Sequence, residues 1–194
     1  NTGGMGAVSP VPFANAELLE KIEKKVVQPS ISGLKKANID YCGFLFIGLM
    51  IVNGEPYVIE YNVRMGDPET EVVLPRIDSD FGKLLIACCE GTLDAEEIEF
   101  SAQAATTVML VSGGYPEGYE KGKPMSGLDR LKNVIAFHAG TKADGSKVLT
   151  NGGRVLALTS MGKNYEEALQ RSYENAEKVS FEKKYYRRDI GFDL

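Results

Sequence analysis

Three polar side chains at alternating positions, Glu60, Asn62 and Arg64, are the residues of this sequence best suited to chemistry. Side chains on a β-strand alternate between two faces, so these three would share one face. A carboxylate and an amide oxygen suit a hard cation such as Mg²⁺, which prefers one or two carboxylates together with phosphate oxygens. Arg64 adds a planar guanidinium that fits a phosphate or a carboxylate. The pattern predicts a site for a metal-bound phosphate compound, and an ordinary ion pair of Glu60 with Arg64 is the alternative.

The elements expected to position these side chains are a strand over residues 57–62, a sharp turn at Gly66 and the start of a helix. Asp67 is expected to be the N-cap of that helix, with Pro68 at its first position. Asn53-Gly54 is a strong hairpin signal. The first arm of this hairpin, residues 41–52, is almost entirely apolar, which predicts a strand buried on both faces.

The rest of the chain alternates between helical and strand patterns. Residues 15–27 predict an amphipathic helix with Asn15 as N-cap, and Pro29 either kinks it or starts a second helix. Residues 80–90 predict a helix that stops at Gly91. Beyond an acidic stretch at residues 92–101, the pattern predicts short strands at 104–112, 134–139, 147–150 and 154–160, followed by a helix at 164–178.

Composition excludes several classes of function. The chain has 194 residues and a net charge of −5, with no basic stripe that would mark a nucleic-acid interface. Its longest apolar run, residues 43–52, is too short to span a bilayer, and no signal peptide is visible. Three cysteines, Cys42, Cys88 and Cys89, lack the spacing of a metal site. Their odd number favours a reducing cytoplasm, and the adjacent pair is interpreted as packing residues.

Two strings give the chain a family resemblance. Residues 64–71, RMGDPETE, closely resemble the signature of the phosphoribosylamine–glycine ligases (glycinamide ribonucleotide synthetases), which are ATP-grasp enzymes of purine biosynthesis. Residues 1–7, NTGGMGA, match the same family residue for residue. Met65 departs from the pattern, where Phe or Leu is expected, and this change concerns packing rather than chemistry.

The resemblance covers essentially the whole chain but only the C-terminal part of the family. It implies an α+β fold: the C-terminal half of an ATP-grasp domain, an antiparallel sheet with helices, at residues 1–98, and a small α+β C-terminal domain of strands plus one helix at residues 99–194. The N-terminal domains of the same protein, with the lid and most adenine contacts, are expected to be missing. The fragment alone is therefore expected to be inactive.

The implied reaction joins glycine to 5-phosphoribosylamine at the expense of ATP, through a glycyl phosphate intermediate. By resemblance, Glu60 and Asn62 would hold Mg²⁺ or Mn²⁺ across the ATP phosphates, and Arg64 would neutralise the transferring phosphoryl group. Arg64 and Asp67 are the candidate catalytic residues. Many ATP-grasp enzymes place another metal-binding carboxylate on the first arm of the hairpin, and residues 43–52 contain none.

Glycine and phosphoribosylamine are expected to bind two Gly-rich loops and the acidic motif. Residues 1–12 could form a nest of backbone N–H groups for an anion or be a plain linker. Residues 150–154 could bind a phosphate or ribose or be a hairpin turn. His138, the only histidine, is more easily explained as a structural residue than as a catalyst. The candidate substrate-binding residues are Thr2, Gly3, Gly4, Asp67, Glu69, Asn151, Gly152, Gly153 and Arg154.

Two other functions stay open at this stage. A different ATP-grasp carboxylate–amine ligase would share the phosphate chemistry but use other substrates. A non-catalytic binding module would carry the acidic cluster only as a surface feature. Omitting glycine from an assay separates the first alternative from the implied enzyme, and titration with Mg²⁺ and phosphate compounds addresses the second.

Overall fold

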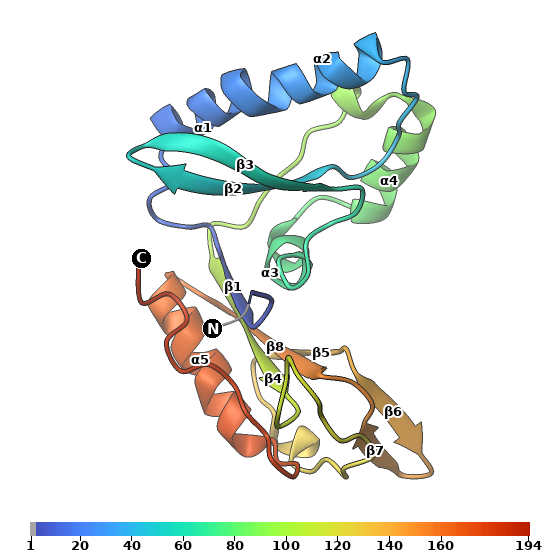
Figure 1. Cartoon of the computed structure of the whole chain (residues 1–194), viewed down its shortest axis with the longest axis vertical. Coiled ribbons are helices and arrows are strands. Elements are labelled where there is room, and N and C mark those ends of the chain that lie inside the picture. Colours follow the sequence, from blue (N-terminus) through green and yellow to red (C-terminus); the bar gives the residue numbers. More distant parts are fainter. Residues whose placement is uncertain (1–2) are drawn as a thin grey trace. The chain divides into compact units, whose positions relative to one another are not determined.

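A computed structural model describes residues 3–194, which form two compact units (Figure 1). The first, here called the sheet unit, comprises residues 3–10, 67–78 and 100–193, and the second, the hairpin unit, comprises residues 11–66 and 79–99. Antiparallel sheets and helices confirm the expected α+β class. The expected domain division between residues 98 and 99 stays a prediction, because the grouping by contacts also assigns two earlier segments to the sheet unit.

The hairpin unit is built on two antiparallel strands, β2 (Phe46–Val52) and β3 (Glu55–Asn62). Asn53 and Gly54 connect them with positive φ angles of 53° and 76°, which confirms the predicted tight turn. The first arm begins at Phe46 rather than at residue 41, and its side chains are not buried on both faces: Met50 and Val52 are 54% and 46% exposed. The faces of a strand are buried only where helices or another sheet pack on them, so an apolar sequence alone did not determine burial.

Helices complete the hairpin unit. α1 (Ala16–Ile22) starts at Asn15, whose Oδ1 accepts a hydrogen bond of 2.9 Å from the amide of Leu18, as predicted. A π-helical segment (Glu23–Val27) continues α1 directly into α2 (Gln28–Lys36), and Pro29 is the second residue of α2, immediately after this segment. α4 (Phe81–Glu90) is capped by Asp80 and ends at Gly91 with φ 71°, which confirms both predicted boundaries.

The sheet unit contains a four-stranded antiparallel sheet in the order β1-β4-β8-β5. Its strands are β1 (Gly6–Ser9), β4 (Ala104–Val111), β8 (Arg154–Gly162) and β5 (Ile135–His138). Strand β1 corrects the prediction that residues 1–12 form only a loop. Its four residues carry no clear strand pattern, and they become a strand by pairing with β4, where Gly6 lies opposite Val108.

Both faces of the central strands are covered. On one face, α5 (Tyr165–Lys178) packs on β4 and β8 around a cluster that includes Val108, Leu158 and Ala176. On the other face, Met109 and Ala157 pack with Met5. All eight residues of β4 are therefore buried, which makes this strand the centre of the sheet unit.

The remaining elements are short. A second hairpin joins β6 (Thr141–Asp144) to β7 (Lys147–Thr150) through Gly145, and β6 was not predicted because its sequence, TKAD, lacks apolar alternation. α3 (Thr70–Val73) is one turn long and contacts β1, β4 and β8. Single 3₁₀ turns occupy Leu74–Arg76, Leu93–Ala95 and Leu128–Arg130. Within residues 3–194, none of the helices combines the length and apolarity needed to cross a bilayer.

Candidate active site

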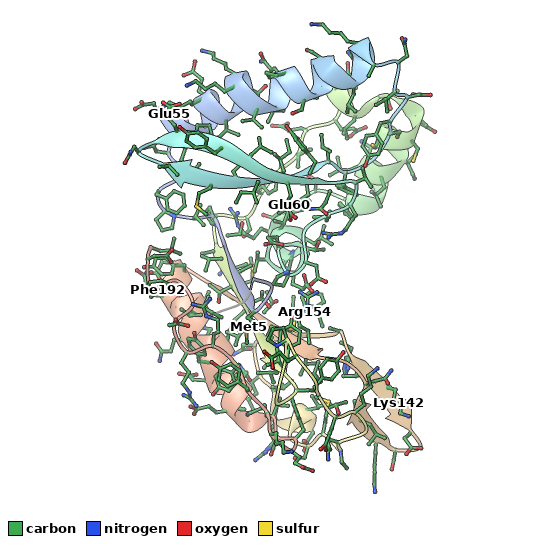
Figure 2. All side chains as sticks on the ribbon, in the orientation of Figure 1. Met5, Glu55, Glu60, Lys142, Arg154 and Phe192 are labelled. Carbon is green, nitrogen blue, oxygen red and sulfur yellow. The ribbon has the colours of Figure 1, made fainter. Side chains whose placement is uncertain are left out.

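Glu60, labelled in Figure 2, and Asn62 lie near the end of β3, in the hairpin unit. The Asn62 amide donates a hydrogen bond of 3.0 Å to Oε1 of Glu60, so the two side chains share one face as the alternation predicted. Gly48 on β2 lies opposite Glu60, and a Cβ at Gly48 would lie 3.0 Å from the Cγ atom of Glu60. The glycine thus leaves room for the glutamate side chain. The register also shifts beside Gly48, a β-bulge of the kind often found next to active sites.

This pair fits a divalent cation. Adjacent oxygens around an octahedral Mg²⁺ with bonds of 2.0–2.1 Å lie about 2.9 Å apart. Turning the Asn62 amide over would put its oxygen where the nitrogen now lies, 3.0 Å from Oε1 of Glu60. A carboxylate and an amide oxygen at that spacing could occupy two neighbouring positions of one ion, leaving the others for water or phosphate. Among residues 3–194, no group of three or more His, Cys, Asp or Glu side chains is arranged to hold a metal.

Arg64 follows β3 and is exposed. One of its terminal nitrogens, Nη1, donates a hydrogen bond of 2.8 Å to the carbonyl of Met65. This contact is local and folds the side chain back along its own backbone. A guanidinium carries five N–H groups, so this bond leaves donors for an anion. Whether Arg64 acts together with Glu60 and Asn62 stays a prediction.

Asp67 does not cap a helix, which corrects the sequence prediction. The peptide bond between Asp67 and Pro68 is cis, and α3 begins at Thr70 with Glu69 at the N-cap position. The carboxylate of Asp67 instead accepts a hydrogen bond from Nη2 of Arg154, the first residue of β8. Capping was predicted from the Asp-Pro pair alone, whereas a charged partner 87 residues away in the sequence takes the carboxylate.

Arg154, labelled in Figure 2, donates hydrogen bonds to three acceptors in the sheet unit. Besides the Asp67 carboxylate, its Nη1 atom donates to the Asp67 carbonyl at 3.0 Å and to the Gly4 carbonyl at 3.3 Å. Gly4 has a φ of 80°, and a Cβ there would lie 2.9 Å from Nη1 of Arg154. Both the backbone conformation and the close approach therefore require glycine. Three of the predicted substrate-binding residues, Gly4, Asp67 and Arg154, are thus brought together.

Glu71 joins this cluster and was not among the predicted site residues. Its Oε2 atom is buried and has no hydrogen-bond partner among residues 3–194. Burial raises the pKa of the Glu71 carboxyl above its usual value, and the negative charges of Asp67 and Glu69 add to the rise, while its own backbone and Arg154 oppose it. The sequence feature that could have identified Glu71 is its place as the third acidic residue of the motif at residues 67–71. Asp67, Glu69, Glu71, Arg154 and Gly4 are called the Asp67 cluster below.

The loop at residues 151–153 connects β7 of one sheet to β8 of another, so the alternative of a hairpin turn at residues 150–154 is wrong. β7 pairs with β6, whereas β8 pairs with β4 and β5. The loop is tightly held: the carbonyls of Gly152 and Gly153 accept hydrogen bonds of 2.8 Å from the hydroxyl and the amide of Ser112. A Cβ at Gly152 would lie 2.9 Å from the Cα atom of Gly140. The structure therefore explains why glycine is needed at position 152, and the role of this loop in binding stays a prediction.

The other predicted residues are spread over the sheet unit. Gly3 is exposed, and a Cβ added to it would meet nothing within 4 Å. Asn151 is exposed, and its backbone N–H donates to the carbonyl of Gly140 at 2.7 Å. Thr2 lies outside the described residues. The ring of His138 is hydrogen-bonded through Nδ1 to the hydroxyl of Thr141 at 2.9 Å, which agrees with a structural role.

Comparison with known proteins identifies the class first. Residues 1–70 match the model of the phosphoribosylglycinamide synthetase ATP-grasp (A) domain, and residues 105–193 match that of the phosphoribosylglycinamide synthetase C domain. The fold also resembles the N5-carboxyaminoimidazole ribonucleotide synthetase of Thermotoga maritima, with a TM-score of 0.58 at 16% identity over 91% of this chain and 45% of that one. The chain is therefore part of an ATP-grasp protein.

Closer relatives identify the family. The phosphoribosylamine–glycine ligase of Chlorobaculum tepidum is 44% identical over 98% of this chain and 46% of its own length. A bifunctional purine biosynthetic protein of Pichia angusta is 46% identical over 98% of this chain and 24% of its own length. The crystal structure of the phosphoribosylamine–glycine ligase of Thermotoga maritima has a TM-score of 0.85 and 41% identity, covering 97% of this chain and 46% of that one. The chain belongs to the phosphoribosylamine–glycine ligase family and spans about half the length of the single-function relatives.

Proposed function

We propose that this chain supplies the C-terminal part of an ATP-dependent ligase that joins glycine to 5-phosphoribosylamine in purine biosynthesis. The observation that carries the proposal is the continuous stretch from Glu60 to Glu71. Its first residues include the carboxylate–amide pair of Glu60 and Asn62 in the hairpin unit. Its last residues, 67–71, contribute to the Asp67 cluster in the sheet unit. The relatives that share this stretch are named phosphoribosylamine–glycine ligases.

The chemical problem is that a carboxylate is a poor electrophile. Transfer of the γ-phosphoryl group of ATP to the glycine carboxylate gives glycyl phosphate and ADP. The amine of phosphoribosylamine then attacks the carbonyl carbon, and phosphate leaves as glycinamide ribonucleotide forms. Such transfers are catalysed mainly by positioning and by neutralisation of charge, and they need no covalent nucleophile from the protein.

In this proposal, Glu60 and Asn62 would hold the Mg²⁺ or Mn²⁺ that accompanies ATP, and an ion held there would supply positive charge to the phosphates. Arg64 supplies a further positive charge to the transferring phosphoryl group through the donors left after its bond to Met65. Loss of one such stabilising contact typically costs a hundredfold or more in rate.

The Asp67 cluster is proposed to bind glycine. Asp67 is 50% exposed in its side chain, so its carboxylate can accept the ammonium group of an amino acid while Arg154 holds it in place. This assignment changes the expected role of Arg154: it orients Asp67 rather than binding a phosphate. Gly3, Glu69 and the loop at residues 151–153 remain the proposed contacts for the remainder of the substrates, together with Thr2.

A different ATP-grasp ligase is the second candidate function. The Glu60–Asn62 pair alone would serve any carboxylate substrate, whereas the Asp67 cluster favours a substrate that carries an ammonium group. We propose a cytoplasmic location, because the odd number of cysteines in the sequence, three, favours a reducing compartment. ATP, glycine and phosphoribosylamine are the proposed small-molecule partners.

The direct test is a chimera. In the ligase of Chlorobaculum tepidum, which is 44% identical, the matching segment would be replaced by this chain. We expect the chimera to release ADP only when ATP, glycine and phosphoribosylamine are all present, and to form glycinamide ribonucleotide in equal amount. The unaltered relative is the positive control, and omission of glycine separates this function from that of another ATP-grasp ligase.

Folding is checked independently by circular dichroism and by thermal unfolding. A chimera that folds but releases no ADP in response to glycine would contradict the proposed function. Equal turnover with a different amino acid in place of glycine would contradict the substrate assignment while leaving the ligase chemistry intact.

A further inference from the structure

The hairpin unit contains three thiols that the proposed function does not use. Cys42 lies in the segment before β2, and Cys88 and Cys89 lie in the last turn of α4. The Sγ atoms of Cys42 and Cys88 are 3.8 Å apart, and the Cys42 thiol also donates to the carbonyl of Cys88 at 3.2 Å. A disulfide bond is about 2.05 Å long, so these two sulfurs lie within 2 Å of bonding distance.

A second contact holds the Cys42 segment on the same helix. The ring of Phe44 stacks on that of Phe81, with centroids 6.3 Å apart. Gly43, between Cys42 and Phe44, has a φ of 140°, and the Tyr41 hydroxyl donates to the carbonyl of Phe44 at 2.5 Å. The segment is thus anchored at the start of α4 by an aromatic pair, and Cys42 meets the end of the helix.

Helix geometry selects Cys88 over Cys89. Phe81 and Cys88 are seven residues apart, which is two turns, so both face the Cys42 segment. Cys89 is rotated by about 100° around the helix axis. Its thiol is still close enough to add to the rise in the pKa of Cys42, a rise that comes first from the hydrogen bond with Cys88. The assignment must therefore be tested against Cys89 directly.

We propose that Cys42 and Cys88 form a reversible intramolecular disulfide by exchange with a low-molecular-weight disulfide such as oxidised glutathione. The exposed thiolate of Cys42 attacks oxidised glutathione, forms a mixed disulfide and releases one glutathione thiolate. Cys88 then attacks the Cys42 sulfur, forms the Cys42–Cys88 bond and releases the second glutathione. Two protein thiols are oxidised, one glutathione disulfide is reduced to two thiols, and the two thiol protons pass to them.

The disulfide would tie the segment before β2 to the end of α4 within the hairpin unit. In a reducing compartment the dithiol is the resting state, and oxidation of the glutathione pool converts it. This inference is independent of the ligase assignment, because none of the three cysteines belongs to the proposed active site.

Peptide mapping of the folded chain tests the linkage. The protein is equilibrated at pH 8 in glutathione buffers of graded composition, acid-quenched, alkylated and digested with trypsin. Cleavage after lysine and arginine places Cys42 in peptide 37–64 and both other cysteines in peptide 84–121. We expect these two peptides to become linked by a disulfide. The linkage should persist in Cys89→Ser, the matched control, and disappear in Cys88→Ser.

The same titration in 8 M urea supplies a reference without native contacts. We expect the effective concentration of the two thiols to be at least tenfold higher in the folded chain than in urea. A Cys88–Cys89 or Cys42–Cys89 bond in the wild type, loss of the linkage in Cys89→Ser, or an effective concentration no higher than in urea would each overturn the proposal. In the wild type, fragmentation of the linked peptides between Cys88 and Cys89 shows which of the two carries the alkyl group. That result and the urea comparison decide the question even if Cys88→Ser does not fold.

Discussion

Glu60 and Asn62 illustrate how much a single alternation can predict. Two residues apart on a strand, they were expected on one face, and the 3.0 Å hydrogen bond between them confirms it. Their service as metal ligands remains a proposal. It requires the Asn62 amide to turn over, so that its oxygen replaces the N–H group that now donates to the Glu60 carboxylate.

Replacing Glu60 tests that proposal. In the chimera, Glu60→Gln removes the charge and keeps the size of the side chain, so we expect kcat to fall a hundredfold or more without loss of fold. Steady-state ADP release and thermal unfolding measure the two effects. Glu90→Gln, at the exposed end of α4, is the matched control and should retain full turnover. Near-normal turnover in Glu60→Gln would remove Glu60 from the metal site.

Glu71 gives a pH-dependent prediction. Its pKa is raised by burial in the folded state, so between its ordinary value near 4.5 and the raised value the folded chain retains a proton that the unfolded chain loses. Stability from this group is complete below that window and falls as the pH rises through it. The amide side chain in Glu71→Gln stays neutral across this pH range. We therefore expect the Tm of the variant, relative to the wild type, to be higher at pH 7 than at pH 4. A constant difference across that range would show that Glu71 titrates normally.

At the scale of elements, the start of the chain depends on one glycine. Gly4→Ala places a Cβ at positive φ and 2.9 Å from Nη1 of Arg154. We therefore expect the free energy of unfolding of the sheet unit to fall by about 1–2 kcal/mol and its Tm by about 2–8 °C. Thermal unfolding followed by circular dichroism measures this. Gly3→Ala is the matched control, because a Cβ there meets nothing within 4 Å. Equal effects of the two substitutions would mean that the Arg154 contact does not constrain this segment.

The elements themselves were predictable where local chemistry determines them. Asn15, Asp80 and Asn164 each cap the helix that they were expected to start or precede, and Gly91 ends α4. Strand β1 and the true partner of Asp67 were missed. Both arise from pairing with residues distant in the sequence, namely β4 and Arg154, and local patterns contain no information on such partners.

At the scale of the whole molecule, the chain spans about half the length of its single-function relatives. We therefore expect the isolated chain to form no glycinamide ribonucleotide above background when ATP, glycine and phosphoribosylamine are supplied. Product analysis by liquid chromatography and mass spectrometry measures this, with the chimera as the active control. Measurable ligase activity from the isolated chain would show that these residues contain a complete active site.

The sequence by itself determined the family, the α+β class, the hairpin turn and most helix boundaries, because motifs, caps and turn residues act over a few neighbouring positions. Only the tertiary structure decided that Arg154 holds Asp67, that Glu71 carries a buried oxygen, and that Cys42 lies beside Cys88. The two contacts join residues separated by 87 and 46 positions along the chain. Such distant partners are selected by packing and charge in the folded chain, and no local preference of either residue specifies them.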